Sequence, residues 1–334
     1  MDFLIVFLFF IASTSISLLY KKIANDLNIL SVKNHRSLHE LPTPSGGGIV
    51  FSLLSILAFL LIFWNLQLTE ELLLALVIGG FTATLFGFVD DIKNIRIKVK
   101  LIIQFSLACW VVFCLYSSEL LSLGLTPLYI TIPILLLFMV WMMNAYNFVD
   151  GIDGMAASGS IFISLALALT VFLNDGPTEI IAIFILMAFT IIGFILFNWP
   201  PASIFMGDAG SVFLGYTLGV LLLFTVLNND ISIWIWLTVF GYFFADTMVT
   251  QIIRVVLVKR WYLAHRSHAY QNLARITESH LKVTSGVTLY NIIWILPLTI
   301  LSVLQPEMEI LAAILAITPA MVFAYKYGPV LSSS

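Results

Sequence analysis

Two adjacent carboxylates mark the first segment of this chain that could do chemistry. Asp90 and Asp91 end an apolar stretch that passes through Gly87, and a run of basic residues follows: Lys93, Arg96, Lys98 and Lys100. Neighbouring residues on a helix point about 100° apart, so the two carboxylates cannot face one ligand in the same way. We therefore expect them to have different roles at a cation or phosphate site. A solvated helix end with snorkelling basic side chains is the structural alternative.

A second segment, residues 144–154, repeats amides and carboxylates at three-residue steps. The members of this series are Asn144, Asn147, Asp150 and Asp153, and glycines at 151 and 154 allow the backbone to turn or to approach a ligand closely. These side chains suit hydrogen bonds to a base or a ribose, or the binding of a cation. The segment is no EF-hand, because the alternating oxygen ligands and the final Glu are absent. We predict a ligand-binding loop.

A third segment carries one carboxylate between glycines at the start of an apolar stretch. Asp208 stands between Gly207 and Gly210, after the helix stop Pro200-Pro201. A helix N-terminus attracts phosphate, and a carboxylate there can hold a divalent ion against that phosphate. We therefore predict that Asp208 is a metal ligand. The structural alternative is a simple N-cap, a role that Asp often has.

The fourth segment is rich in histidine and arginine. It contains His265-Arg266-Ser267-His268 and follows a stretch with Asp246 and Arg254 near its end. Cations here could neutralise a diphosphate. A zinc site is weakly supported, because the His-x-x-His pair has no third and fourth ligand nearby. The glycine run 46–48 is no Walker loop, since no Gly-Lys-Ser/Thr follows it.

The elements that must position these segments are membrane-spanning helices. The chain has 334 residues, of which 61% are hydrophobic and 10% charged, a net charge of −3 and a mean hydropathy of +1.07. This composition indicates an integral membrane protein and excludes a soluble domain. A spanning helix needs roughly 20 apolar residues. About eleven such segments occur, at 2–20, 47–65, 71–89, 101–118, 127–143, 157–173, 179–197, 211–227, 231–257, 286–304 and 308–326. We predict one all-α, polytopic domain over residues 1–334.

The basic residues predict how this domain is oriented. When the segments are threaded back and forth, all fifteen lysines and arginines fall on one side, with Arg254 near an inner helix end. Cytoplasmic loops of membrane proteins retain Lys and Arg, so this side is predicted to be the cytoplasm. The odd number of helices then places the N-terminus outside and the C-terminus in the cytoplasm. The four chemical segments lie on the cytoplasmic side, where we expect the active site.

Together, these segments resemble the polyprenyl-phosphate N-acetylhexosamine-1-phosphate transferases, glycosyltransferase family 4. This family includes the enzyme that initiates enterobacterial common antigen and O-antigen, and the phospho-MurNAc-pentapeptide translocase. The resemblance covers most of the chain and rests on five segments in the family's order: Pro42-Thr43-Pro44 with Gly46 to Gly48, Gly87 to Asp91, Asn144 to Gly154, Phe205 to Ser211 and His265 to His268. Five such segments in order are hard to obtain by chance.

The resemblance implies a reaction and its parts. Undecaprenyl phosphate attacks a UDP-activated amino sugar, giving undecaprenyl-diphosphate-sugar and UMP, with Mg²⁺ or Mn²⁺ bound. By the same resemblance, Asp90 and Asp91 serve the lipid phosphate and the metal, Asp208 and Asp91 are the metal ligands, and further residues contact substrate. Asn147, Asp150 and Asp153 are placed around the nucleotide, and Asn144 is a further substrate-binding residue. We add as phosphate contacts Lys98, Arg254, His265 and His268.

The resemblance also implies a setting: the inner membrane of a bacterium, no nucleic-acid partner and a lipid substrate from the bilayer. A homodimer is compatible with it. Ser45 stands where many relatives have a basic residue, and His265-Arg266-Ser267-His268 lacks an adjacent His-His pair. The second departure favours the branch that initiates O-antigen and lipopolysaccharide. The donor stays open among UDP-GlcNAc, UDP-GalNAc, UDP-FucNAc and UDP-QuiNAc types.

Three questions stay open at the level of sequence. Asp90 could be a general base or a positioning residue, because a phosphate monoester with a second pKa of about 6 is already mostly ionised at neutral pH. An aspartyl-phosphate intermediate is a minor alternative. A lipid or solute transporter is the rival function. Transport sites place ionisable residues near the bilayer midplane, whereas Asp246 and Arg254, the charges inside a predicted helix, lie toward its inner half.

Overall fold

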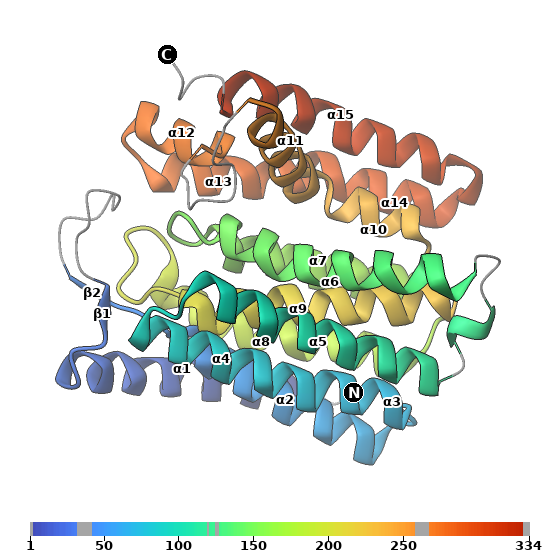
Figure 1. Cartoon of the computed structure of the whole chain (residues 1–334), viewed down its shortest axis with the longest axis horizontal. Helices are drawn as coiled ribbons and strands as arrows, with labels where there is room; N and C mark the ends of the chain where they lie inside the picture. The colour runs from blue at the N-terminus through green and yellow to red at the C-terminus, as the bar shows by residue number, and fades with distance from the viewer. Residues whose placement is uncertain (1–2, 32–41, 119, 124–126, 258–266, 330–334) are drawn as a thin grey trace.

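The helices of this chain run side by side, and their ends gather the chemical segments at one end of the molecule (Figure 1). The computed structural model describes residues 3–31, 42–118, 120–123, 127–257 and 267–329. The α-helices are α1 (Phe3–Asp26), α2 (Gly48–Asn65), α3 (Glu70–Leu74), α4 (Gly80–Lys93), α5 (Ile97–Ser117), α6 (Leu128–Val149), α7 (Met155–Leu173), α8 (Thr178–Asn198), α9 (Gly207–Leu227), α10 (Ile233–Val239), α11 (Gly241–Leu257), α12 (Ala269–Thr277), α13 (His280–Tyr290), α14 (Leu296–Leu304) and α15 (Glu309–Tyr327).

Short irregular elements join some of these helices. The π-helical turns η1 (Ala75–Gly79) and η3 (Asn291–Ile295) connect α3 to α4 and α13 to α14, and η2 (Leu120–Leu123) and η4 (Pro306–Met308) are 3-10 turns. Two short strands, β1 (Leu30–Ser31) and β2 (Thr43–Pro44), pair antiparallel with Leu30 opposite Pro44. The all-α architecture predicted from the sequence is confirmed.

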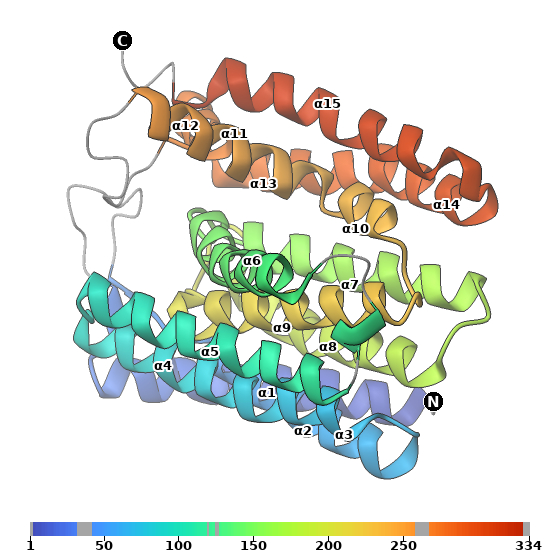
Figure 2. The same cartoon turned by 45° about the vertical axis from the view of Figure 1, so that its right-hand side comes forward.

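The number of membrane-spanning helices agrees with the prediction of about eleven. In the part of the chain that the structure describes, ten helices are long and apolar enough to cross a membrane, or eleven if α10 and α11 count as one span. The start of α1 and the end of α15 lie at opposite ends of the helices in both views (Figures 1 and 2). An odd number of crossings produces this arrangement, which agrees with counting α10 and α11 as one span.

The expectation of one uninterrupted helix over 231–257 is wrong. Helices α10 and α11 meet at Phe240 with a bend of 81°. At this break, a Cβ on Gly241 would lie 3.2 Å from the carbonyl oxygen of Ala316 in α15. The close approach of α15 accommodates the bend at a glycine, whereas hydropathy alone shows a continuous apolar stretch.

The predicted end of the fifth segment at residue 143 is also wrong. Helix α6 continues to Val149, so Asn144 and Asn147 belong to a helix and only Asp150 and Asp153 to the following turn. A helix that crosses into a polar region does not end where its apolar residues end, because backbone hydrogen bonds continue regardless of side-chain polarity. For the same reason, α4 extends to Lys93, α5 begins at Ile97 and α13 begins at His280.

Helix α9 is the central element. Every residue from 209 to 221 is buried, as expected for a helix that is apolar all round. It packs against α2, α4 and α6. Helix α8 lies between α1, α2 and α7, and α15 packs against α10, α11 and α14. Neighbouring helices therefore surround the first turn of α9, independently of its polar contacts.

Small residues let these neighbours approach the start of α9. A Cβ on Gly87 of α4 would lie 2.2 Å from the carbonyl oxygen of Asp208, and one on Gly48 of α2 would lie 2.3 Å from the Cα of Gly210. No side chain fits at such distances, so the glycines allow backbone to pack directly on backbone. This contact fixes the position of Asp208 relative to α4.

We predict that Gly87→Ala destabilises the protein by about 1–3 kcal/mol, because its methyl group must push α4 away from α9. The matched control is Gly286→Ala in α13, where a Cβ would meet nothing within 4 Å. That variant should be neutral or slightly more stable, because Ala favours a helix over Gly. Melting temperatures of the two detergent-solubilised variants measure the difference. Equal melting temperatures would contradict the packing assigned to Gly87.

Candidate active site

The first part of the site is the turn between α4 and α5, which a hydrogen bond to Asp90 stabilises. Asp90 lies in the last turn of α4 and is 4% exposed. Its Oδ1 accepts a hydrogen bond from the backbone N–H of Ile95 at 2.6 Å, and its Oδ2 forms an ion pair with Lys100. Both carboxylate oxygens of Asp90 are therefore engaged within the protein.

Asp208 is the second part, and it is approached from two other helices. Its Oδ1 accepts a hydrogen bond from Asn147 Nδ2 of α6 at 2.6 Å, and its Oδ2 lies 3.3 Å from Lys100 Nζ of α5. Asn147 also contacts the hydroxyl of Ser211 at 3.3 Å. Lys100 thus stands between Asp90 and Asp208, where its positive charge offsets part of their repulsion.

Asp91 makes the third part by capping α9 from a different helix. Its Oδ1 accepts from the backbone N–H of Asp208 at 2.8 Å and its Oδ2 from that of Ala209 at 3.1 Å. The first N–H groups of a helix have no partner within the helix, and a negative charge there is favourable. Gly207 permits this contact, because its φ is +72° and a Cβ there would lie 2.4 Å from Asp91 Oδ2. Asp90 and Asp91 therefore make different contacts, and the different roles predicted for them stay a prediction.

The glycine run after β2 braces the loop that leads into α9. The backbone N–H of Phe205 donates to the carbonyl of Pro44 at 2.7 Å, and the N–H groups of Gly47 and Gly48 donate to the carbonyls of Phe205 and Met206 at 3.0 and 2.9 Å. These bonds join residues distant in sequence. The segment that resembles a family motif therefore holds the α8–α9 loop in place.

Asp150 lies in the turn after α6 and faces the same group of carboxylates. Burial raises the pKa of Asp150 well above its usual range, and the negative charges of Asp208, Asp91 and Asp153 raise it further. A cation bound near these carboxylates would lower this pKa. We call Asp90, Asp91, Lys100, Asn147, Asp150 and Asp208 the carboxylate cluster.

Two residues predicted to bind substrate, Asn144 and Asp153, make polar contacts within the protein. Asn144 Nδ2 donates to Gln104 Oε1 at 2.8 Å, which joins α6 to α5. Asp153 Oδ2 accepts from the backbone N–H of Ala202 at 3.0 Å, and its Oδ1 lies 3.3 Å from His280 Nδ1. Asp153 thereby connects the turn after α6 to the α8–α9 loop and to α13.

The described part of the fourth segment packs beside the end of α6, where the ring centroids of His268 and Phe148 lie 5.6 Å apart. His268 is 1% exposed, and its Nδ1 lies 3.0 Å from Asp246 Oδ2. Asp246 Oδ1 also accepts from the N–H of Ala269 at 2.9 Å, so this carboxylate anchors the start of α12 on α11. Arg254 is a buried residue of α11. His265 lies outside the described residues.

Lys98 is the lysine predicted from the sequence to contact phosphate, and Lys100 is the lysine that contacts the carboxylates. Lys98 is exposed, whereas Lys100 reaches both Asp90 and Asp208. Gln104 is the signal that could have separated the two lysines. It lies one helical turn after Lys100 on α5, is buried and pairs with Asn144 of α6. Residues four apart share a helix face, so Lys100 and not Lys98 follows the face directed at α6.

The oxygen donors of the cluster are of the kind that Mg²⁺ prefers. Among the described residues, no three side chains of His, Cys, Asp or Glu converge as a ready metal site. Mg²⁺ does not need such a cage, because it is usually bound by one or two carboxylates, water and substrate phosphates. Asp208 and Asp91, at the start of α9, fit that limited demand.

Comparisons with known proteins match the same region. A family model described as "Glycosyl transferase family 4" matches residues 73–226, a range that contains the entire carboxylate cluster. A Bacillus subtilis protein named "Probable undecaprenyl-phosphate N-acetylglucosaminyl 1-phosphate transferase" is 28% identical over 267 residues, covering 78% of this chain and 74% of that protein.

Two proteins named phospho-N-acetylmuramoyl-pentapeptide-transferase are also similar. The one from Fervidobacterium nodosum is 32% identical over 225 residues, covering 64% of this chain and 66% of its own length. The one from Prochlorococcus marinus is 36% identical over 232 residues, covering 61% and 63%. The chain thus spans slightly less than two thirds of these two relatives.

We predict that Lys100→Gln lowers the free energy of unfolding by about 1–2 kcal/mol, because it leaves Asp90 and Asp208 without their shared cation. The expected loss is small because the Lys100 side chain is 32% exposed, so solvent screens its ion pair with Asp90. Lys98→Gln, an identical change two residues earlier, should leave stability unchanged. Thermal unfolding in detergent compares the two. A larger loss in Lys98→Gln would refute the assignment of Lys100.

Proposed function

Because the chain belongs to glycosyl transferase family 4, we propose that it transfers an N-acetylamino-sugar 1-phosphate from a UDP-sugar to undecaprenyl phosphate. An oxygen of the lipid phosphate forms a bond to the β-phosphorus of the donor, the bond from that phosphorus to the bridging oxygen breaks, and UMP leaves. The observation that carries the proposal is the carboxylate cluster, in which α4, α5, α6 and α9 bring Asp90, Lys100, Asn147 and Asp208 together within the matched range.

The cluster provides what phosphoryl transfer requires of a protein. Such reactions depend on positioning and on neutralising charge at the transferring group. Lys100 supplies a cation beside Asp90 and Asp208, and Asn147 fixes the orientation of the Asp208 carboxylate. Asp91 holds the start of α9, so the carboxylate of Asp208 keeps its place when charge builds up nearby.

A divalent ion fits the donor set. We infer that Asp208 and Asp91 would hold Mg²⁺, with Mn²⁺ as the alternative. When bound, such an ion neutralises negative charge on the diphosphate of the donor. The pKa of Asp150 responds to the charges of Asp208 and Asp91. An ion bound by these two carboxylates would therefore also interact electrostatically with Asp150.

We propose that the cluster faces the cytoplasm of a bacterium's inner membrane. Lys93, Arg96, Lys98 and Lys100 lie at the end of the helices that carries the cluster, in keeping with the tendency of cytoplasmic loops to retain basic residues. A UDP-sugar would then come from the cytoplasm and undecaprenyl phosphate from the bilayer.

The donor and the product polymer are finer proposals. The sequence His265-Arg266-Ser267-His268 supports the branch that initiates O-antigen or lipopolysaccharide synthesis, with a donor of the UDP-GlcNAc, UDP-GalNAc, UDP-FucNAc or UDP-QuiNAc type. The names of the similar proteins include both an N-acetylglucosaminyl and a muramoyl-pentapeptide transferase. A smaller donor without a peptide is the one we favour.

Release of UMP tests the function directly. The purified protein in detergent should release UMP only when undecaprenyl phosphate, Mg²⁺ and the correct UDP-amino sugar are all present. Chelation with EDTA should abolish release, and added Mg²⁺ should restore it. Asp208→Asn should reduce kcat at least 100-fold, because it removes the negative charge of the carboxylate that we propose binds the metal. No release with any donor, from protein shown to be folded, would favour the transporter and call for lipid-flipping assays.

Asp90→Asn tests whether Asp90 is a base. Because both of its oxygens contact Ile95 and Lys100, we expect a positioning role, and the lipid phosphate is already mostly dianionic above pH 7. The variant should therefore lose at least tenfold in kcat, with the same ratio to wild type at pH 7, 8 and 9. Recovery of the rate as the pH rises would instead identify Asp90 as a general base.

A further inference from the structure

An apolar groove runs between α13 and α15. Its volume is about 370 Å³, a size typical of small-molecule sites. A Cβ on Gly286 of α13 would meet nothing within 4 Å, and Pro319 and Ala320 line the groove from α15. Small residues on both helices therefore leave the space open. We call it the α13–α15 groove; its lining comes from Tyr242 of α11, Leu273 of α12, α13 between Lys282 and Tyr290, and α15 between Pro319 and Phe323.

Hydrogen bonds between the two helical segments close one end of the groove. Pro319 has no N–H, so the carbonyl of Leu315, four residues earlier, loses its usual helical partner. This carbonyl accepts instead from Nε1 of Trp294 at 3.1 Å. The carbonyl of Ala316 accepts from the hydroxyl of Tyr290 at 3.0 Å. The groove therefore ends at these two bonds and extends from them toward the start of α13.

The groove lies in the part of the chain that crosses the membrane. The segments His280–Leu304 and Pro306–Tyr327 are both long and apolar enough to span it. From Lys282 to Tyr290, α13 rises about 12 Å, close to the roughly 15 Å of hydrocarbon in one leaflet. Gly286 and Pro319 are exposed at the protein surface. The groove therefore opens sideways toward lipid over about the depth of one leaflet.

A positive charge stands at the end of the groove nearest the membrane surface. Lys282 lines the groove from the first turn of α13 and is exposed. Lys326 follows Phe323 by three residues on the same face of α15, which adds a second lysine at this end. None of the described residues that line the groove is Asp or Glu. An apolar groove below a lysine matches a lipid with a negatively charged headgroup.

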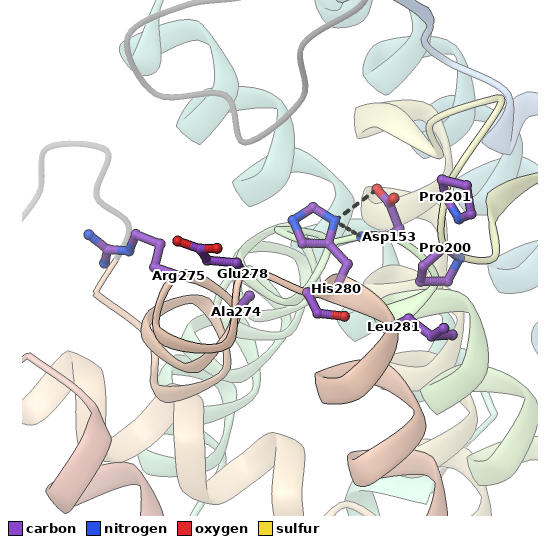
Figure 3. Close-up of a pocket in the computed structure, with 9 residues that line it drawn as sticks. Asp153, Pro200, Pro201, Ala274, Arg275, Glu278, His280 and Leu281 are labelled. Atoms are coloured by element: carbon purple, nitrogen blue, oxygen red, sulfur yellow. Dashed lines mark hydrogen bonds and ion pairs between the residues drawn. The ribbon is translucent and has the colours of Figure 1, made fainter.

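The groove is poorly placed for the lipid substrate proposed above. Helix α13 stands between it and a pocket beside Asp153, which Figure 3 shows next to His280. His280 Nδ1 lies 3.3 Å from Asp153 Oδ1, and the hydroxyl of Thr284 donates to the carbonyl of Asp153 at 2.7 Å. Gly286 lies about 200° around the helix from Thr284. A phosphate beside Lys282 would therefore be across α13 from the turn that carries Asp153.

We propose that the α13–α15 groove binds one acyl chain of an anionic phospholipid of the bilayer, and that Lys282 contacts the phosphate of this lipid. The site is separate from the function proposed above and does not depend on it. Because α13 also holds Asp153, the bound lipid supports the helix behind that turn.

Native mass spectrometry of the purified protein in detergent tests the proposal by measuring the binding of single lipids. The anionic probe is dioleoyl phosphatidylglycerol, and dioleoyl phosphatidylcholine, which has the same chains and no net charge, is the comparison. The wild type should bind one phosphatidylglycerol more tightly than phosphatidylcholine. Lys282→Gln should weaken binding of phosphatidylglycerol about fivefold, because it removes one positive charge beside the headgroup. Its binding of phosphatidylcholine should change little.

Lys22→Gln is the matched control for the charge. Lys22 is an exposed lysine of α1, a helix on the opposite side of the molecule from α15 (Figures 1 and 2). This variant should bind both lipids like the wild type.

Gly286→Leu tests the groove itself. Its side chain enters open space, so the melting temperature should stay the same. Both lipids should bind about tenfold more weakly, because the acyl chain no longer buries apolar surface there. Gly286→Ala, whose methyl group is too small to fill the groove, should bind both lipids like the wild type.

Three outcomes would overturn the proposal. In the first, Lys282→Gln or Gly286→Leu binds phosphatidylglycerol like the wild type. In the second, the wild type binds the two phospholipids equally well, so charge has no part in recognition. In the third, undecaprenyl phosphate displaces the bound phosphatidylglycerol and itself binds more weakly to Gly286→Leu, so the groove holds the lipid substrate. Release of UMP tests the proposed function separately from all three.

Discussion

The arrangement of the site depends on the cap that Asp91 places on α9. A carboxylate from α4 accepts the first N–H groups of the most deeply buried helix, and one of those N–H groups belongs to Asp208. The orientation of the Asp208 side chain is therefore set by its own backbone, which is held by a neighbouring helix. Glycine is required at two positions here, because a Cβ on Gly207 would meet the Asp91 carboxylate and one on Gly87 would meet the backbone of Asp208. The other polar contacts of Asp208, to Asn147 and Lys100, depend on this position of its side chain.

The Asp91 carboxylate that caps α9 also adds to the negative charge of the site. Asp90, Asp91 and Asp208 contribute three carboxylates and Lys100 one ammonium group, so the ionised set has an excess of negative charge. Burial and the negative charges of Asp208, Asp91 and Asp153 raise the pKa of Asp150, which disfavours a further negative charge at this place. The repulsion within such a set would be relieved by a divalent cation, and in the function that we propose the bound cation would attract a polyanionic substrate.

The sequence predicted the architecture well because lipid imposes a simple rule: a helix must stay apolar for the thickness of the bilayer. The same rule fails at the ends of helices. Asn144 and Asn147 were placed in a loop although α6 continues through both, and the bend at Phe240 is invisible in a continuous apolar stretch. Composition also does not separate Lys98 from Lys100, because the two differ only in which face of α5 they occupy. That face depends on packing against α6, which arises only in the folded protein.

Some polar residues in the predicted loops hold elements of the protein together. The sequence does not distinguish them from the residues that we assign to substrate. Asp246 holds the start of α12 through His268 and Ala269, and the hydroxyl of Tyr270 donates to the carbonyl of Phe148 at the end of α6. These bonds attach the segment after α11 to the helices that carry the cluster. The attachment also shapes the pocket beside Asp153, which has one wall from each part. A change in the α12–α13 turn can therefore move one wall of this pocket while the contacts of Asp91 with α9 stay the same.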